Sequence, residues 1–333
     1  MSVTIYEIAE RADVSSSTVA RVLRGDVKET QVRSATNANK IRKIAREMGY
    51  RPNRLARAFS RGKTYGIGLL YTDDAWIFEG VNMTVVNSLV RELQSRGYHL
   101  VFVPIDESNA WKDILLGGQI DGGLVFQELP GDVRNALDEK ELPLVMLGDN
   151  SDPTVSQVVV DDFAGAYAAT KHLGGLGHER IMLYVHDSIK PHCSIGERRR
   201  GFDKAMEDLG LASKASFLHS TEEDVIHCLQ HGNSRPTGVI CYSNLEATLL
   251  VHAMWQYGVS IPKDLSIIGF NDIFATKYMT PPLTTVGFDA ERIGVYGARM
   301  VVEEIDGENT GGAPQVEVIK PKLIVRGSTA RFR

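Results

Sequence analysis

Hydrophobic and polar residues follow two different periods along the chain, and the change falls near residue 63. In "VTIYEIAERA" the apolar residues recur at helical spacing, and Thr4 and Glu7 have the spacing of a capping box. In "DVSSSTVARVL" Ser15 or Ser16 is placed to cap a second helix, and Asp13 tolerates the tight turn before it. Two short helices joined by so tight a turn predict a helix-turn-helix.

A third helix is predicted for "NKIRKIAREMGY", where Ile41, Ile44 and Met48 share one face and Gly49 is placed to end it. The second helix carries short hydroxyl side chains and one arginine on its polar face: Ser16, Ser17, Thr18 and Arg21. Hydroxyl groups contact phosphates and base edges, and arginine pairs with guanine through two hydrogen bonds. The plain alternative is a polar serine loop, but the apolar spacing continues on both sides of the serines.

After residue 63, short apolar and β-branched runs alternate with helical patterns. The runs are "YGIGLLYT", "HLVFVPI", "DGGLVF", "LPLVMLG", "VSQVVVD", "RIMLYV", "TGVICYS" and "LSIIGF". This alternation predicts parallel α/β sheets covered by helices on both faces. Some 270 residues are many for one such sheet, so two lobes are expected.

The first 62 residues are basic and the remainder is acidic. Residues 1–62 contain 13 Lys and Arg against 6 Asp and Glu, whereas the rest of the chain contains 24 basic and 36 acidic residues. This separation predicts a polyanion-binding module joined to a body that does not bind polyanions. Charge alone does not distinguish nucleic acid from membrane lipid as the partner.

Composition indicates a soluble globular protein: 43% of the 333 residues are hydrophobic and 24% are charged. No apolar run approaches the roughly 18 residues of a membrane span, and the N-terminus lacks the pattern of a secretory signal. The three cysteines are widely spaced and predict neither a disulfide framework nor a Cys-x-x-Cys metal site. A reducing cytoplasm is the expected location, no membrane partner is expected, and no cofactor is expected.

The segment "VTIYEIAERADVSSSTVARVL", with the later "EMGYRPNRLARAFSRGKTYGIGLL", resembles the N-terminus of the lactose-repressor (LacI/GalR) family. Helix order, turn position and the residues after Tyr50 all match that family's pattern. The resemblance implies that Thr4, Ser15 and Thr18 contact phosphates. It also implies that four side chains lie near base edges: Tyr6, Ser16, Ser17 and Arg21.

This sequence departs from the family pattern in the head. Asp13 and Ala20 stand where the family usually has Gly and Ser, and "RGDVKETQVRSATNAN" is longer than the family norm. Asn37–Ala38 replaces the usual Thr-Arg pair at the start of the third helix. Substitute phosphate contacts are expected from Lys28, Arg33 and Lys40.

Residues 50–62, which include "RPNRLARAFSRG", are predicted to form a hinge helix that folds only against DNA, because isolated helices below ~12–15 residues are marginal in water. The resemblance implies paired hinge helices in the minor groove, where an apolar side chain opens the central base step. Phe59 stands where the family usually has Leu, and packing of Phe59 on the body is the alternative. The implied DNA contacts are Asn53, Arg54, Leu55, Ala56, Arg57 and Phe59.

The resemblance continues through "VVVDDFAGAYAATKHLGGLGHERI", "TPPLTTV" and "LIVRGST". The family's body is similar to periplasmic sugar-binding proteins, which implies two lobes crossed by three strands near Asp161, Gly287 and Lys320. The N-lobe is then about 63–160 and 289–319, and the C-lobe about 161–288 and 320–333. A small ligand is expected in the cleft, beyond the carboxyl ends of the strands.

Seven residues are candidates for the effector pocket. Arg198 matches the family arginine that grips an effector hydroxyl or carboxylate. Asn271 replaces a family Asp, and Ser243 and Asn244 replace an Asn-Asp pair, which changes the groups accepted and leaves the ligand class open. The loop "TDDAWIFEG" contributes Asp73, Trp76 and Phe78.

Enzyme signatures are absent from the sequence, which has no G-x-S-x-G, Walker loop, H-E-x-x-H or G-x-G-x-x-G. Asp161–Asp162 and Asp73–Asp74 are adjacent carboxylates, which point to opposite faces of a strand and make a poor acid/base pair. The stretch "HDSIKPHC" carries four metal-ligating residues, but a loop that lines the cleft is the preferred interpretation and no metal is expected. The chain is therefore not expected to be an enzyme.

These observations predict an N-terminal all-α helix-turn-helix head and an α/β, two-lobed, periplasmic-binding-protein-like effector body. The predicted domains are 1–49 for DNA binding, 50–62 for the hinge, and 63–333 for effector binding and dimerisation. The predicted function is a repressor that binds a palindromic operator in double-stranded DNA and is controlled by a sugar or related metabolite. A homodimer is expected, because the end "GSTARFR" lacks the leucine heptad of tetrameric members. The alternative is a small-molecule-binding protein or sugar-processing enzyme with a vestigial basic head.

Overall fold

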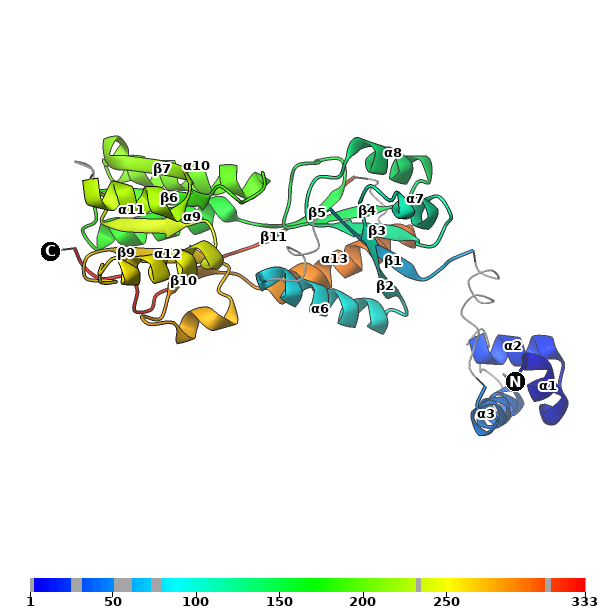
Figure 1. Cartoon of the computed structure of the whole chain (residues 1–333). Coiled ribbons are helices and arrows are strands. Elements are labelled where there is room, and N and C mark those ends of the chain that lie inside the picture. The colour runs from blue at the N-terminus through cyan, green and yellow to red at the C-terminus, as the bar shows by residue number, and fades with distance from the viewer. Residues whose placement is uncertain are drawn as a thin grey trace. The chain divides into compact units, whose positions relative to one another are not determined.

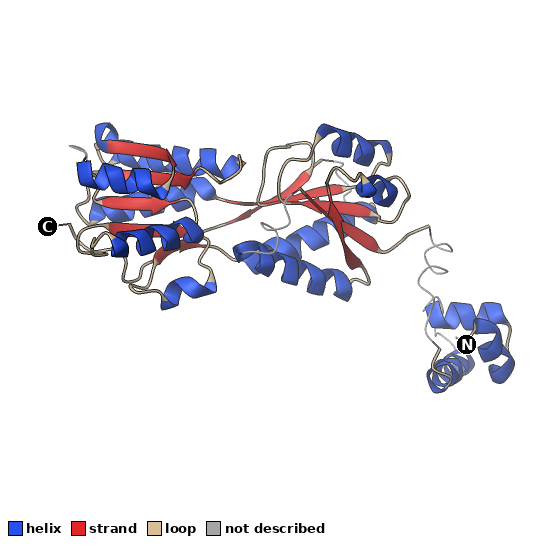
Figure 2. Cartoon of the chain, in the orientation of Figure 1, coloured by secondary structure: helices blue, strands red, loops and turns tan. Residues whose placement is uncertain are grey.

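The computed structural model describes residues 3–24, 32–50, 62–72, 80–231, 235–308 and 313–332. The chain forms two compact units, Met1–Thr64 and Tyr65–Arg333, here called the head and the body. Figure 1 labels their helices and strands, and Figure 2 colours them by type.

The described part of the head contains three helices: α1 Ile5–Ala12, α2 Ser16–Arg24 and α3 Val32–Glu47. Their apolar faces meet in one cluster that includes the buried side chains of Ile8, Val19 and Ile41. The capping box at the start of α1 is formed, since Glu7 N donates to Thr4 Oγ1 at 3.3 Å and Thr4 N donates to Glu7 Oε2 at 2.7 Å. Asp13 takes the left-handed conformation, with φ of 57°, and turns the chain toward α2.

Helix α3 begins at Val32, well before the predicted start at Asn39. Periodicity missed this first part because its sequence, "VRSATNAN", is largely small and polar. Ala38 is nevertheless fully buried in the head core. Among the described side chains of this part, Thr36 to Asn39, only Ala38 is buried, and one small apolar residue gives almost no signal in the sequence.

The first sheet of the body has the strand order β11-β5-β4-β3-β1-β2, with all pairs parallel. Its strands are β1 Gly66–Tyr71, β2 His99–Pro104, β3 Gly122–Val125, β4 Leu144–Leu147, β5 Ser156–Val160 and β11 Val316–Ile319. Helices α6 Gly80–Ser95 and α13 Ala290–Ile305 cover one face, and α7 Ala110–Leu115 and α8 Gly131–Glu139 cover the other (Figure 1). This sheet and its helices are called the N-lobe.

The second sheet has the order β12-β10-β9-β8-β6-β7, in which only the edge strand β12 is antiparallel. Its strands are β6 Ile181–His186, β7 Ala215–Ser220, β8 Gly238–Cys241, β9 Ser266–Phe270, β10 Thr284–Gly287 and β12 Lys322–Ile324. Helices α9 Asp162–Gly175 and α10 Cys193–Asp208 cover one face, and α11 Glu222–His231 and α12 Asn244–Gln256 cover the other. Two 3-10 turns, Ala212–Lys214 (η1) and Phe274–Tyr278 (η2), complete this C-lobe.

The chain passes between the lobes three times, from β5 to α9, from β10 to α13 and from β11 to β12. Figure 2 shows these passages as the connections between the two red sheets. Parallel strands place their carboxyl ends at one edge of each sheet. The loops that follow the strands therefore gather where the lobes face each other.

Strands β7, β10, β11 and β12 lie outside the eight runs predicted as strands, and β12, like β7 and β11, is an edge strand. β7 and β11 are edge strands with half-exposed residues, so they lack the continuous apolar run that marks a buried parallel strand. β10, with the sequence "TTVG", is fully buried but consists mostly of threonine and glycine. Among the described residues, no helix is long and apolar enough to cross a membrane.

Candidate effector pocket and DNA-reading helix

The N-terminus of α2 is capped by Ser15, the first of the two caps that the sequence allowed. Thr18 N donates to Ser15 Oγ at 3.2 Å, and the Ser15 hydroxyl also lies 2.9 Å from the hydroxyls of Ser17 and Thr18. These bonds fix the three hydroxyl groups at the start of the helix. The N-terminus of a helix with exposed hydroxyls is suited to an anionic phosphate.

The predicted base-reading side chains are exposed or half-buried on the surface of the head. Ser17 and Arg21 are exposed on α2, Ser16 is half-buried, and Tyr6 on α1 is 75% exposed. An aromatic side chain so exposed gains nothing from the head core, which is consistent with a role in contact with another molecule. Thr4 is exposed as well, although its hydroxyl already serves the cap of α1.

Lys40 is predicted to supply a phosphate contact, but its side chain binds within the head. Its Nζ donates to the carbonyl oxygen of Ala12 at 3.0 Å and so ties α3 to the end of α1. The side chains of Lys28 and Arg33 lie outside the described residues, as do all six hinge candidates: Asn53, Arg54, Leu55, Ala56, Arg57 and Phe59.

A cavity of about 320 Å³ lies between the two lobes of the body. The N-lobe lines it with the start of α6, the residues after β3 and β4, the end of β5 and the residues at the start of α13. The C-lobe lines it with the loop 188–192, the first turns of α10 and the segments after β8 and β9. The cavity therefore occupies the place that the parallel topology predicts for a ligand.

Arg198 reaches this cavity from α10 as half of a buried ion pair. Its Nε lies 2.7 Å from Oδ1 of Asp162, and both side chains are 7% exposed. Its Nη1 donates to the carbonyl oxygen of Tyr242, and its guanidinium lies between the rings of Tyr242 and Phe270. Burial raises the pKa of the Asp162 carboxyl, and the Arg198 charge opposes that shift.

Close packing of α10 on α9 brings the two charges together. Gly201, one turn after Arg198, lies so near the backbone of Phe163 that an added Cβ would meet Phe163 O at 2.2 Å. A larger residue there would push the helices apart. The sequence offered Asp162 only as half of an adjacent carboxylate pair, whereas its neighbour Asp161 caps α9 by accepting from Ala164 N at 2.9 Å.

The remaining described candidates divide between pocket and core. Ser243 and Asn271 line the cavity, each directly after a strand of the C-lobe or one residue further. Asn244 does not line it: the side chain is 1% exposed and its Oδ1 accepts from Thr285 Oγ1 at 2.9 Å. Asn244 is the first residue of α12, and its side chain points toward Thr285 of β10 rather than into the cleft. Asp73, Trp76 and Phe78 lie outside the described residues.

Several pocket residues were not among the seven candidates, although the stretch "HDSIKPHC", which contains Lys190 and His192, was predicted to be a loop that lines the cleft. Polar groups are supplied by Asn82, Gln127, Asp162, Lys190, His192 and Ser194, and aromatic walls by Phe126, Tyr242 and Phe288. Their common signal is position, because most of them follow a strand or begin a helix at the edge where the lobes face each other. Side-chain type alone did not separate them from ordinary loop residues.

Comparison with known proteins agrees with this arrangement of head and body. Residues 4–53 match the family of bacterial regulatory proteins called lacI, and residues 170–329 match the periplasmic binding protein-like domain. The chain is 27% identical to the HTH-type transcriptional repressor PurR of Photobacterium profundum, over 98% of each chain.

Two solved structures are similar over nearly the whole chain. The lac repressor dimer bound to operator and the anti-inducer ONPF has a TM-score of 0.80 at 20% identity, covering 99% of this chain and 100% of that one. A complex of the transcriptional regulator CelR with cellobiose has a TM-score of 0.68 at 25% identity, covering 98% and 99%.

A helix-turn-helix head joined to a periplasmic-binding-protein-like body defines a class of DNA-binding transcriptional regulators. The chain carries the DNA-binding domain of the lacI family in its head and a periplasmic binding protein-like domain in its body.

Proposed function

We propose that the chain is a repressor whose affinity for a palindromic operator changes when a small metabolite binds between the lobes of its body. The observation that carries the proposal is the cavity at the carboxyl ends of two parallel sheets, in a chain whose head exposes Ser17 and Arg21 on a capped helix. We divide the chain at residues 1–49, 50–62 and 63–333 into reading head, hinge and effector body.

Binding in the cavity acts through the lobes, because groups from both lobes line it. A ligand that contacts both lobes binds more tightly to the lobe arrangement in which all its contacts are made. This difference in affinity between the two arrangements shifts the equilibrium between them. The N-lobe begins directly after the hinge segment, so a change of lobe arrangement alters how two hinges meet. Operator and ligand then change each other's affinity by the same factor.

The ligand class that the pocket favours is a neutral, hydroxyl-rich molecule such as a sugar. Arg198 presents a charge already neutralised by Asp162, which lowers its preference for a free carboxylate. Asn82, Gln127 and Asn271 offer amides, which both donate to and accept from hydroxyl groups. The relative CelR is described in complex with cellobiose, which agrees with a sugar.

We propose a homodimer, the state described for the similar lac repressor structure. The C-lobe offers an apolar surface for the contact, in which Leu249 of α12 is 42% exposed and Phe274 and Tyr278 of η2 are 74% and 67% exposed. The two elements are adjacent, since Thr248 and Met279 are in contact at 3.6 Å. Large exposed apolar groups gathered in one place are typical of an interface.

A cytoplasmic, non-enzymatic regulator is thus the proposed identity, and a binding protein or sugar-processing enzyme with a vestigial head is the competing one. Deletion of residues 1–62 separates the two. A regulator loses DNA binding and keeps ligand binding, as measured by a thermal-shift screen of sugars, phosphosugars, purines and acids. If the truncated and full chains bind DNA equally, or if the full chain turns over a ligand found in the screen, the proposal fails.

A further inference from the structure

Three metal-ligating side chains meet where the N-lobe and C-lobe face each other: Asp149, His192 and Cys193. Asp149 lies between β4 and β5 in the N-lobe, whereas His192 caps α10 of the C-lobe and Cys193 is the first residue of that helix. One ligand atom from each residue lies within 4.8 Å of the others. From this geometry we propose a second ligand site, for a zinc-like divalent metal ion, that joins the two lobes.

Distances within the group suit a tetrahedral ion. His192 Nε2 lies 3.4 Å from Asp149 Oδ2, which is longer than a normal N–H···O hydrogen bond of about 2.7–3.2 Å. Zinc binds nitrogen and oxygen at about 2.0–2.2 Å and sulfur at about 2.3 Å, so two of its tetrahedral ligands are about 3.3–3.6 Å apart. The nitrogen–oxygen edge already has this length. The ligand atoms lie up to 4.8 Å apart, so the Cys193 sulfur has to approach by at most about 1.2 Å on the same estimate.

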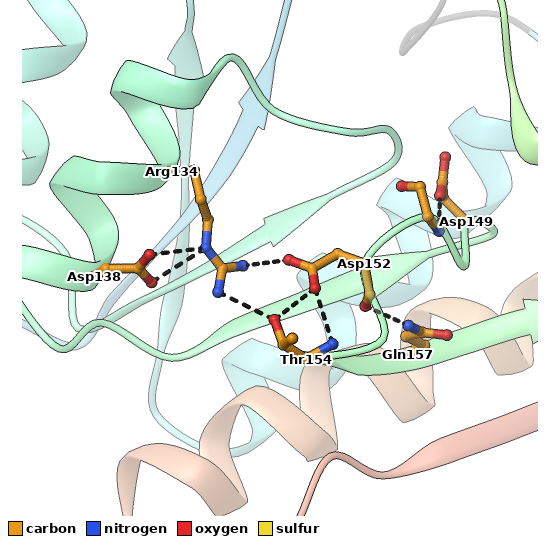
Figure 3. Close-up of polar contacts among 7 residues, drawn as sticks. Arg134, Asp138, Asp149, Asp152, Thr154 and Gln157 are labelled. Carbon is orange, nitrogen blue, oxygen red and sulfur yellow. Dashed lines mark hydrogen bonds and ion pairs between the residues drawn. The ribbon is translucent and has the colours of Figure 1, made fainter.

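The N-lobe ligand is held in place by its loop. Arg134 of α8 forms ion pairs with Asp138, at 3.1 Å, and with Asp152, at 2.8 Å, as Figure 3 shows. Asp152 in turn accepts from Thr154 N at 2.8 Å. In the same loop Ser151 N donates to Asp149 Oδ1 at 2.7 Å, and the other carboxylate oxygen, Oδ2, is the one near His192. Arg134 is therefore a positioning residue for the proposed site.

The C-lobe ligands are supported in the same way. His192 Nδ1 lies 2.8 Å from the Ser194 hydroxyl, which lies 2.8 Å from the Tyr242 hydroxyl. In the structure Nδ1 also accepts from Ser194 N at 3.2 Å, which is the cap of α10. When Nε2 binds a metal ion, Nδ1 carries the proton and donates to the Ser194 hydroxyl, and the cap is given up. Hydrogen bonds of this kind orient a histidine ligand and fix its tautomer.

The ligand set selects the class of metal. A thiolate, an imidazole and a carboxylate suit Zn²⁺ or Co²⁺, whereas Mg²⁺ and Ca²⁺ prefer oxygen ligands alone. Coordination replaces the thiol proton of Cys193, which leaves to solvent, by the metal ion. Three protein ligands leave one tetrahedral position for water or another small molecule.

A metal ion bound here ties Asp149 of one lobe to His192 of the other, next to the cavity that His192 also lines. The ion is then a second effector, and by linkage it changes the affinity for any ligand that alters the lobe arrangement. The site needs only the body. Its failure would leave the repressor function proposed above unchanged.

The test is a titration of the full chain with Co²⁺, read from its visible ligand-field bands and its near-ultraviolet sulfur-to-cobalt charge-transfer band. One Co²⁺ per chain is expected, with both bands displaced by Zn²⁺. Cys193→Ser should lose the charge-transfer band. His192→Gln and Asp149→Asn should weaken binding by at least about tenfold, the loss typical of disturbing even an outer partner of a metal ligand.

Matched controls use residues outside the group. Cys228 is also half-buried, and His186 lies in the same stretch of sequence, so Cys228→Ser and His186→Gln should keep both bands and the affinity. Arg134→Ala should keep the charge-transfer band and bind Co²⁺ more weakly. A wild-type chain without a charge-transfer band at saturating Co²⁺, or a band that persists in Cys193→Ser, would overturn the proposal.

Discussion

Arg198 and Asp162 form an ion pair that is buried beside the effector cavity, with 2.7 Å between Nε and Oδ1. The guanidinium carbon lies 4.5 Å from the ring centre of Tyr242 and 4.0 Å from that of Phe270. Both partners belong to the C-lobe, so the pair does not depend on how the lobes are arranged. It gives the pocket a rigid, neutral polar group against which a hydroxyl can be placed.

Asp162→Asn is expected to lower the free energy of unfolding by about 3–5 kcal/mol, because it leaves the Arg198 charge buried without its partner. Chemical denaturation followed by circular dichroism measures the change. Lys204→Ala, which removes an exposed ion pair with Asp208 on the same helix, is the control and should remain close to wild type. Equal losses in the two variants would mean that the buried ion pair contributes no more to the free energy of unfolding than the exposed one.

The body is expected to lose stability as the pH falls below about 6.5, the ordinary histidine pKa. Burial lowers the pKa of His178, whose ring lies 3.0 Å from both Thr237 Oγ1 and Ala330 O. A lowered pKa in the folded state means that the unfolded chain binds the proton more tightly, so the stabilisation is complete above pH 6.5 and declines toward acid.

His178→Gln should therefore flatten the dependence of the unfolding free energy on pH between about 7 and 5, whatever its effect at neutral pH. Denaturant titrations at several pH values measure this slope. The exposed His219→Gln is the control and should keep the wild-type slope. An unchanged slope in His178→Gln would show that other groups cause the acid sensitivity.

Arg21→Ala is expected to weaken operator binding by about 1–3 kcal/mol, the value of a bidentate contact to a base, and to relax the preference at one base pair. Fluorescence anisotropy with operator and single-base variants measures both effects. Lys43→Ala removes an exposed charge whose partner is Glu47 and serves as control. A loss that is equal for every DNA sequence would make Arg21 a phosphate contact instead.

Phe59→Ala is expected to reduce the bending of operator DNA more than it reduces the stability of the protein, if Phe59 acts as the apolar wedge of the hinge. Gel-shift assays with circularly permuted operator fragments measure the bend, and thermal melting measures the stability. Phe59→Leu, which restores the usual family residue, should bend DNA as well as wild type. A variant that melts earlier but bends DNA normally would place Phe59 against the body.

Tyr278→Glu is expected to convert the dimer into monomers, because it places a charge in the exposed apolar surface of η2 and α12. Light scattering at several protein concentrations measures the mass. Val316 of β11 is 58% exposed outside this surface, so Val316→Glu should remain dimeric. A dimer that survives Tyr278→Glu would locate the interface elsewhere, and a tetramer in wild type would refute the expected state.

Local signals were sufficient for much of the fold. Thr4 and Glu7 predicted a capping box that the structure contains, and continuous apolar runs predicted the central strands of both sheets except β10, which is buried but mostly threonine and glycine. The signal failed where burial is small or mixed. β7 and β11 lie at sheet edges, and Ala38 is the only buried residue among the described side chains in the first part of α3.

Contacts between residues that are far apart in the sequence were harder to predict than helices and strands. Resemblance to the family pattern identified Ser243 and Asn271 as pocket residues, but it also implied Asn244, whose side chain instead meets Thr285 in the core. Nor did any local pattern connect Asp162 with Arg198, or Asp149 with His192. These contacts depend on how helices and lobes pack, and the periodicity of hydrophobic residues in the sequence does not encode that packing.

The central claim is tested most directly by one binding measurement on the full chain. Operator is first selected from random double-stranded DNA, and its affinity is then measured by anisotropy with and without a saturating ligand found in the thermal-shift screen. We predict a two-fold symmetric site, binding that weakens steeply with salt, and a change of operator affinity of at least about fivefold on adding ligand. No sequence preference, or the same operator affinity at saturating ligand, would contradict the account.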